Sequence, residues 1–198
     1  MFIVFEGIDG AGTSTQAKKL AEKLNHEGII TELTNEPTEE RIGKLAREVL
    51  QKKWQTSPEA LQLLFCADRA DHIFKKINPA LKNNKSIISE RYFYSTIIYG
   101  SLHVDQKWLK ELCKIFIEPD LIFYLDLPEK IAIERIKERG EKIELFEKED
   151  FLKKVRNGFN EIFQNKKNVY KLDGRRSIDE VHKEIYEIVK SVYSMRKI

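Results

Sequence analysis

The chain has 198 residues, of which 41% are hydrophobic and 34% are charged, and its formal net charge is +3. This length and apolar content suit one domain, residues 1–198, with a buried core. Because both signs of charge are interspersed and no basic tract exceeds two residues, the sequence argues against a nucleic-acid-binding protein.

Five short runs rich in β-branched and aromatic residues alternate with longer amphipathic runs. The short runs are FIVFE (2–6), IITEL (29–33), SIISER (86–91), LIFYLD (121–126) and NVYKL (168–172). Several are almost continuously apolar, as buried parallel strands are. The alternation predicts an α/β fold in three layers, with a five-stranded parallel sheet and helices on both faces. Ligands of such sheets bind beyond the carboxyl ends of the strands.

The first strand leads into GIDGAGTST and then into a helix that starts at Thr13. Strand, glycine turn and helix form the context of a phosphate-binding loop. The glycines let consecutive backbone amides form an anion nest, and the helix N-terminus adds positive potential. Ser14 stands where such a loop provides a hydroxyl to Mg²⁺. We therefore predict that ATP is bound by Gly7, Ile8, Asp9, Gly10, Ala11, Gly12, Thr13 and Ser14.

The loop fits the G-x-x-x-x-G-K-[ST] frame except at Thr13, where the frame has lysine. That lysine normally reaches the β- and γ-phosphates and neutralises their charge. Lys18 lies about 7.5 Å further along the helix axis and on another face, so it is a poor substitute. We expect the missing cation to come from a basic lid, approximately residues 135–150, in which Arg135 and Arg139 lie one turn apart.

The segment after the second strand, NEPTEERIGKLAREVL, predicts a loop and then a helix capped by Thr38. Further on, an apolar stripe predicts a helix from Pro58 to about Leu81. In this helix Phe65 and Arg69 are i, i+4 neighbours that could present a ring beside a planar donor fork to a flat aromatic ligand. His72 is assigned no role.

The third strand ends at Glu90 and Arg91. A carboxylate at a strand end beside a phosphate loop is well placed to hold Mg²⁺, and an arginine beside it can hold a phosphate by two hydrogen bonds. Thr96 and Tyr99 follow at helical spacing and could line the same pocket.

Together these stretches resemble the thymidylate kinase family of P-loop nucleoside monophosphate kinases. The motifs that carry the resemblance are Gly7–Gln16, Glu36-Pro37, FCADR (65–69), ERYFYSTIIY (90–99), PDLIFYLD (119–126) and RIKERG (135–140). The chain departs from the family's pattern at Thr13, where the family has lysine, and at Glu90, where it has aspartate. The glycines that often follow Glu-Pro are also replaced, by residues 38–40.

The resemblance implies a P-loop NTPase-type fold with a lid, and transfer of the γ-phosphoryl group of ATP to dTMP with Mg²⁺ as the cofactor. The catalytic residues it implies are Asp9, Arg91, Arg135 and Arg139. The residues it implies for dTMP are Glu36, Arg47, Phe65, Arg69, Arg91, Thr96 and Tyr99. Ser14 and Glu90 would hold the metal. The resemblance also implies a homodimer.

Two other interpretations stay open at this point: a kinase of the same fold with another nucleoside monophosphate or a deoxynucleoside as acceptor, and a nucleotide-binding protein with little catalysis. No apolar run approaches the ~20 residues of a membrane span, and no signal peptide is evident at the N-terminus. The two cysteines, Cys66 and Cys113, form no metal-type spacing. We expect a reduced, cytoplasmic protein that binds neither membrane nor nucleic acid.

Overall fold

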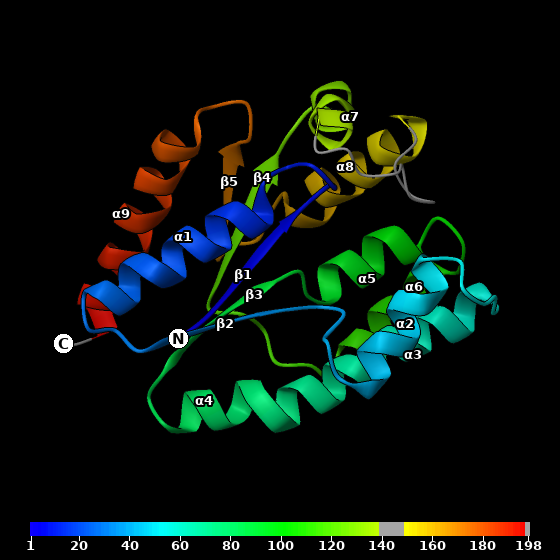
Figure 1. Cartoon of the computed structure of the whole chain (residues 1–198), viewed down its shortest axis with the longest axis horizontal. Coiled ribbons are helices and arrows are strands. Elements are labelled where there is room, and N and C mark those ends of the chain that lie inside the picture. Colours follow the sequence, from blue (N-terminus) through cyan, green and yellow to red (C-terminus); the bar gives the residue numbers. More distant parts are fainter. Residues whose placement is uncertain (139–148, 197–198) are drawn as a thin grey trace.

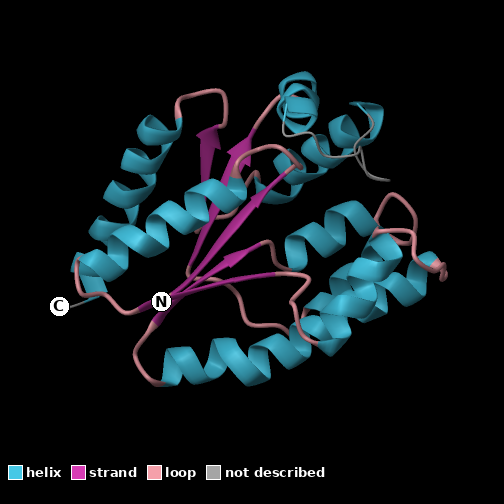
Figure 2. Ribbon diagram, viewed as in Figure 1, coloured by secondary structure: helices cyan, strands magenta, loops and turns pink. Residues whose placement is uncertain are grey.

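The structure is a computed structural model that describes residues 1–138 and 149–196. Within these residues five strands form one parallel sheet in the order β2-β3-β1-β4-β5, so that all strands point the same way (Figure 2). The strands are β1 (Phe2–Gly7), β2 (Thr31–Asn35), β3 (Ser86–Glu90), β4 (Leu121–Asp126) and β5 (Val169–Asp173). The predicted parallel five-stranded α/β fold is confirmed.

Helices cover both faces of the sheet (Figure 1). Helices α1 (Thr13–His26) and α9 (Ile178–Arg196) pack together on one side. The other helices are α2 (Arg41–Leu50), α3 (Pro58–His72), α4 (Asn78–Lys82), α5 (Phe93–Gly100), α6 (Gln106–Cys113), α7 (Glu129–Glu138) and α8 (Glu149–Phe163). A π-helical turn, η1 (Ile73–Ile77), joins α3 to α4, so the helix predicted from Pro58 to about Leu81 is one continuous rod.

The central strands are buried because both of their faces are covered. Every residue of β1 is buried, and β3 and β4 are buried except for their last residues. Between β4 and helices α5 and α8 the core is aromatic. The Tyr124 ring of β4 packs on Phe159 and Phe163 of α8, and Phe163 packs on Tyr94 of α5. Such burial of large apolar side chains is the main stabilising contribution to a fold of this size.

Two local predictions differ from the structure. The second strand begins at Thr31 rather than Ile29, because the chain still turns after α1, with Gly28 at φ 78°, and pairing with β3 starts at Thr31 and Ser86. Helix α2 begins at Arg41 with Glu40 as its N-cap residue, so the predicted cap at Thr38 is wrong. Thr38 instead donates two hydrogen bonds to the buried carboxylate of Asp68 in α3. Among the described residues, no helix is both long and apolar enough to cross a bilayer.

Candidate active site

The carboxyl ends of the strands open into a cavity of about 850 Å³, a size that suits a small-molecule ligand. Segments that are far apart in the sequence meet there: the loop after β1, the segment after β2, helices α2 and α3, and the start of α5. The predicted site residues that line this cavity are Asp9, Gly10, Gly12, Thr13, Ser14, Glu36, Arg47, Phe65, Arg69, Glu90, Arg91, Thr96 and Tyr99.

Other predicted residues lie elsewhere. The side chains of Ile8 and Ala11 are buried in the core, and the Ala11 amide donates to the Ile8 carbonyl at 3.1 Å, which closes the loop. Any contact of Ile8 with a phosphate must therefore use its backbone, and the Ala11 amide is already engaged. Arg135 donates to the carbonyl of Gly174 at 2.9 Å and so ties α7 to the turn after β5. Arg139 lies outside the described residues.

The loop after β1 depends on two glycines with left-handed backbone. Gly10 has φ 81° and Gly12 has φ 95°, a region that glycine adopts without steric cost. A Cβ at Gly10 would also lie 2.7 Å from the carbonyl oxygen of Ala132 in α7. Helix α1 starts directly after Gly12, and the first amides of a helix have no intrahelical acceptor. The loop therefore offers backbone donors at the positive end of a helix, where anions bind.

Both hydroxyls at the start of α1 point to the end of β3. Thr13 Oγ1 donates to Glu90 Oε1 at 2.8 Å, and Ser14 Oγ donates to the same oxygen at 2.5 Å. Lys18, by contrast, is exposed and lies 3.9 Å from Glu22, so it faces away from the loop as predicted. The predicted metal residues Ser14 and Glu90 are thus brought into direct contact.

Arg91 connects three segments of the site. Its NH2 group binds Asp9 Oδ1, and its NH1 group donates to the carbonyl of Gly7 at 3.2 Å. The Tyr99 hydroxyl donates to Asp9 Oδ2 at 3.0 Å, and the Arg91 guanidinium lies 5.2 Å from the centre of the Tyr99 ring. Arg91 itself has φ 65°, a strained conformation for a residue with a side chain. The surrounding contacts hold this arginine at the mouth of the phosphate loop.

The pKa values of Arg91 and Tyr99 are both shifted by their surroundings. Burial disfavours the charge on Arg91, but the neighbouring Tyr99 and Asp9 outweigh it, so the pKa of Arg91 is raised overall. Burial also raises the pKa of the Tyr99 hydroxyl well above its ordinary value. Arg91 therefore stays charged and Tyr99 stays a hydrogen-bond donor at neutral pH.

Glu6 lies beneath Arg91 and was not predicted as a site residue. It is fully buried in β1 and accepts hydrogen bonds from the Tyr92 amide at 3.0 Å and from Ser95 Oγ at 2.6 Å. Ser95 Oγ in turn accepts from Arg91 NH1 at 3.1 Å. Burial raises the pKa of the Glu6 carboxyl to about 7, although the hydrogen bonds from Ser95 and the charge of Arg91 act in the opposite direction. The only signal in the sequence was a carboxylate within an apolar strand.

A second buried network surrounds Arg69. Arg69 Nε donates to Glu36 Oε2 at 2.7 Å, and Arg69 NH2 donates to Thr96 Oγ1 at 3.0 Å. His72 Nδ1 lies 2.9 Å from Glu36 Oε1, and His72 Nε2 lies 2.8 Å from Thr34 Oγ1. The predicted dTMP residues Glu36, Arg69 and Thr96 therefore form one hydrogen-bonded unit, which His72 completes.

The Arg69 guanidinium also keeps one donor unused. Its side chain is 2% exposed and lies 5.2 Å from the centres of the Tyr92 and Phe116 rings. NH1 is buried and has no hydrogen-bond partner in the part of the chain that the structure describes. A buried donor without a partner is costly, so this nitrogen is suited to a ligand with a carbonyl oxygen.

Arg47 binds the segment after β2, and a carboxylate of α3 holds that segment in place. Asp68, 1% exposed, accepts from the Thr38 amide at 2.7 Å and from Thr38 Oγ1 at 2.5 Å. Thr38 can approach α2 because Gly43 has no side chain: a Cβ there would lie 2.1 Å from the Thr38 carbonyl oxygen. Arg47 binds the carbonyl of Pro37 and lies 3.1 Å from Glu39. This arrangement places Arg47 at the cavity, as predicted, and explains the misassigned cap.

The residues that the sequence did not single out act mainly on their neighbours. His72 contacts Glu36, and Ser95 joins Arg91 to Glu6. Asp68 holds Thr38, and Asp68 and Ser95 also line the cavity. In the sequence His72 and Asp68 are indistinguishable from surface polar residues of a helix. His72 follows Arg69 by three residues, so helical spacing alone indicates that the two share a face of α3. Asp68 precedes Arg69 by one residue and has no such signal.

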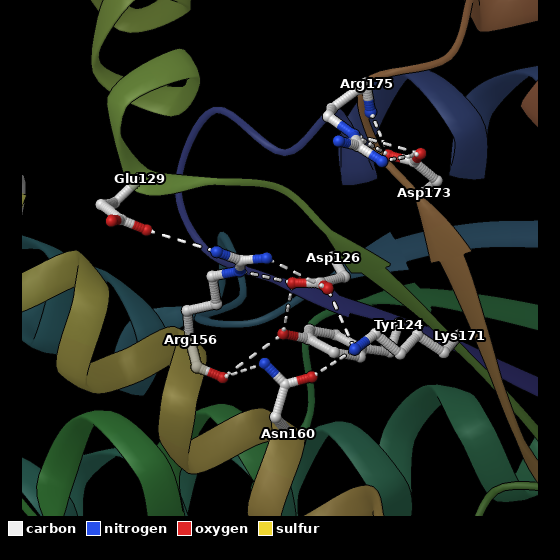
Figure 3. Close-up of polar contacts among 8 residues, drawn as sticks. All are labelled: Tyr124, Asp126, Glu129, Arg156, Asn160, Lys171, Asp173 and Arg175. Atoms are coloured by element: carbon white, nitrogen blue, oxygen red, sulfur yellow. Dashed lines mark hydrogen bonds and ion pairs between the residues drawn. The ribbon is translucent and has the colours of Figure 1, made fainter.

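The carboxyl ends of β4 and β5 form a separate ionic cluster beside a smaller cavity of about 380 Å³ (Figure 3). Arg156 Nε donates to Asp126 Oδ1 at 2.6 Å, Lys171 lies 3.0 Å from Asp126 Oδ2, and Arg156 NH1 lies 3.4 Å from Glu129. Arg175 binds Asp173 at 2.7 Å at the upper end of the same group. Three acidic and three basic side chains balance here, so this cluster joins α7, α8 and the sheet without a net charge for a ligand.

The chain matches one protein family and several known proteins along most of its length. The family model described as thymidylate kinase matches residues 5–185. The chain is 39% identical to a probable thymidylate kinase of Thermococcus onnurineus, over 96% of this chain and 97% of that protein. It is 37% identical to a probable thymidylate kinase of Methanocaldococcus jannaschii, over 97% of both chains. It is 38% identical to a thymidylate kinase of Leptospira interrogans, over 95% of this chain and 93% of that protein.

Proposed function

Because the chain belongs to the thymidylate kinase family, we propose that it transfers the γ-phosphoryl group of ATP to dTMP, giving dTDP and ADP. The family identifies the protein as a kinase of nucleotide biosynthesis. The relatives' shared name favours dTMP over another acceptor, and it favours a kinase over a protein that only binds nucleotides.

One observation carries the choice of acceptor. Arg69 and Phe65 line the same cavity, into which the loop after β1 opens as well, and Arg69 NH1 is buried without a hydrogen-bond partner among the described residues. A pyrimidine that stacks on Phe65 can give Arg69 a carbonyl oxygen, which satisfies this donor. Hydrogen bonds to Glu36 and Thr96 fix the orientation of the Arg69 guanidinium, so its NH1 donor is oriented before the ligand binds.

The donor side uses the loop and the start of α1. The backbone amides of residues 12–15, at the start of α1, can hold the β-phosphate of ATP at the positive end of the helix. Ser14 and Glu90 would hold Mg²⁺, because a hydroxyl and a carboxylate in contact form the hard oxygen set that this ion prefers together with phosphate oxygens. Among the described residues, no cluster of three or more His, Cys, Asp or Glu side chains could hold a metal alone. Bound there, the ion supplies neutralisation of phosphate charge.

The acceptor side uses Arg91, Arg47 and Tyr99. Arg91 can hold the dTMP phosphate beside the phosphate loop, and Arg47 approaches it from α2. Tyr99 can pack under the deoxyribose, where a 2′-hydroxyl would be crowded, and Asp9 anchors both Tyr99 and Arg91. The arrangement performs in-line transfer by positioning and charge neutralisation. Because the acceptor phosphate oxygen is already anionic, the reaction does not depend on a strong general base.

Several parts of this proposal come from the sequence alone. The roles of Arg135 and Arg139 as lid arginines, the homodimer and the cytoplasmic location all stay predictions. So does the absence of a nucleic-acid or membrane partner.

The test is ADP release by the purified protein with ATP and Mg²⁺, measured separately with dTMP, dUMP, UMP, CMP, AMP and thymidine. We expect turnover with dTMP, and weaker turnover with dUMP, which lacks only the methyl group. Preferred turnover of a purine monophosphate or of thymidine would refute the assignment of the acceptor. Nucleotide binding without turnover of any acceptor would refute the kinase.

A further inference from the structure

Thr13 and Glu90, the two positions at which the phosphate loop and the third strand depart from the family's pattern, contact each other. The Thr13 side chain is buried, its hydroxyl donates to Glu90 Oε1 at 2.8 Å, and its methyl carbon lies 3.4 Å from where a Cβ of Gly7 would stand. The side chain is therefore folded inward against the base of the loop. It does not extend along the loop as a lysine must to reach the phosphates.

A hydroxyl group has one hydrogen to donate, and that of Thr13 is used on Glu90. Ser14 donates to the same oxygen at 2.5 Å. Two donors on Oε1 orient the carboxylate, while Oε2 accepts no hydrogen bond from the described residues. A glutamate has one more rotatable bond than an aspartate, so it has more freedom to lose, and this second hydroxyl restricts it.

The ion pairs of the site do not include Glu90: among the described residues, no lysine or arginine lies within 4.0 Å of its carboxylate oxygens. A lysine at position 13 would stand where the Thr13 hydroxyl stands and could pair with this carboxylate. Threonine holds Glu90 by a neutral hydrogen bond and adds no positive charge beside it.

We propose that Thr13 is a positioning residue that fixes Glu90 as the ligand of the nucleotide-bound divalent ion, and that it does not bind phosphate. This inference rests on the proposed metal site at Ser14 and Glu90. It assigns the loop threonine to the metal side of the site. The positive charge that the loop lacks must then come from a different part of the chain.

The experiment compares Thr13→Val, which removes the hydroxyl at nearly constant shape, with Thr13→Ser, which keeps it. Two affinities are measured for each protein: that of Mn²⁺ for the protein–ADP complex, from the EPR signal of free Mn²⁺, and that of ADP in EDTA, by calorimetry. With Thr13→Val we expect Mn²⁺ affinity to fall about tenfold, the effect of one hydrogen bond to a charged group. We expect ADP affinity in EDTA to stay unchanged, and Thr13→Ser to behave as wild type in both.

The opposite result overturns the inference. If Thr13 donates to phosphate, Thr13→Val weakens ADP binding in EDTA and leaves Mn²⁺ affinity unchanged. Glu90→Gln separates the two levels of the proposal. Unchanged Mn²⁺ affinity in Glu90→Gln would refute the metal site itself, whereas a loss in Glu90→Gln without one in Thr13→Val would refute only the role of Thr13. A thermal unfolding curve for each variant shows that it is folded before the affinities are compared.

Discussion

Arg69 and Glu36 form a buried ion pair in which Arg69 uses Nε and NH2, with distances to Glu36 Oε2 of 2.7 and 2.6 Å, while NH1 has no hydrogen-bond partner among the described residues. The pair joins α3 to the segment after β2, so contacts from two elements fix the guanidinium. Planar geometry matters here, because the guanidinium fork can direct separate donors at Glu36 and at a ligand in fixed directions.

Arg69→Lys tests this geometry. A lysine keeps the charge for Glu36 but lacks the fork, so one charged hydrogen bond to the base is lost. We expect KM for dTMP to rise roughly 10- to 100-fold, while KM for ATP stays unchanged. The matched control is Arg175→Lys, which alters an exposed pair outside the cavity. Equal KM values for dTMP in Arg69→Lys and wild type would show that this arginine does not read the base.

His72→Phe tests whether the histidine positions Glu36. The ring keeps its volume, but Glu36 Oε1 and Thr34 Oγ1 lose their partner. Leaving buried polar groups unsatisfied costs about 1–3 kcal/mol in free energy of unfolding, which urea denaturation measures. We also expect KM for dTMP to rise and KM for ATP to stay constant, with partial recovery in His72→Gln. The control is His26→Gln at an exposed position. Loss of stability with both KM values unchanged would reduce His72 to a structural role.

Asp126→Asn tests the ionic cluster of Figure 3. Although partial burial raises the pKa of Asp126, the hydrogen bonds from Arg156 and Lys171 outweigh it, so the pKa lies below its usual value. The stability from this carboxylate is therefore present above the unfolded pKa of about 3.9 and is lost as the pH falls through the folded pKa.

At pH 7 we expect Asp126→Asn to lower the free energy of unfolding by about 1–2 kcal/mol, less than for a fully buried pair because Arg156 is partly exposed. The difference from wild type should shrink as the pH approaches 3. Glu111→Gln removes an exposed pair with Lys114 and should have little effect. A difference that stays constant down to pH 3 would contradict an origin in the ionised carboxylate.

Glu6→Gln tests the buried carboxylate under Arg91. Its pKa of about 7 lies above the value of about 4.3 for an unfolded glutamate. The unfolded chain therefore releases this proton first, and the contribution of Glu6 to stability falls as the pH rises through this interval. Between pH 4.5 and 7.5 we expect the stability of Glu6→Gln to rise relative to wild type. Urea denaturation across this range measures it, with Glu22→Gln on the exposed face of α1 as control. Parallel curves for Glu6→Gln and wild type would argue against a raised pKa.

Much of the fold could be predicted because its signals are local. Apolar runs such as LIFYLD, and the helical stripe from Leu61 to Ile77, are read directly from residue spacing. Strand β2 begins two residues later than predicted. Its start depends on the pairing of Thr31 with Ser86, which lies more than fifty positions later in the sequence. Thr38 looked like a helix cap because the sequence does not show that Asp68 lies beside it.

The sequence by itself determined the α/β class, the glycine turn between β1 and α1 and most of the residues that face the cavity, because glycine spacing, strand ends and helical periodicity are properties of neighbouring residues. Only the tertiary structure decided what each side chain does there. Thr13 turns to Glu90, Arg69 keeps one nitrogen unused, and Arg135 binds Gly174 instead of lining the cavity. These outcomes depend on which groups from distant segments lie close enough to form a hydrogen bond. Because an unpaired polar group costs more free energy when it is buried, these pairings are strongly determined in the interior.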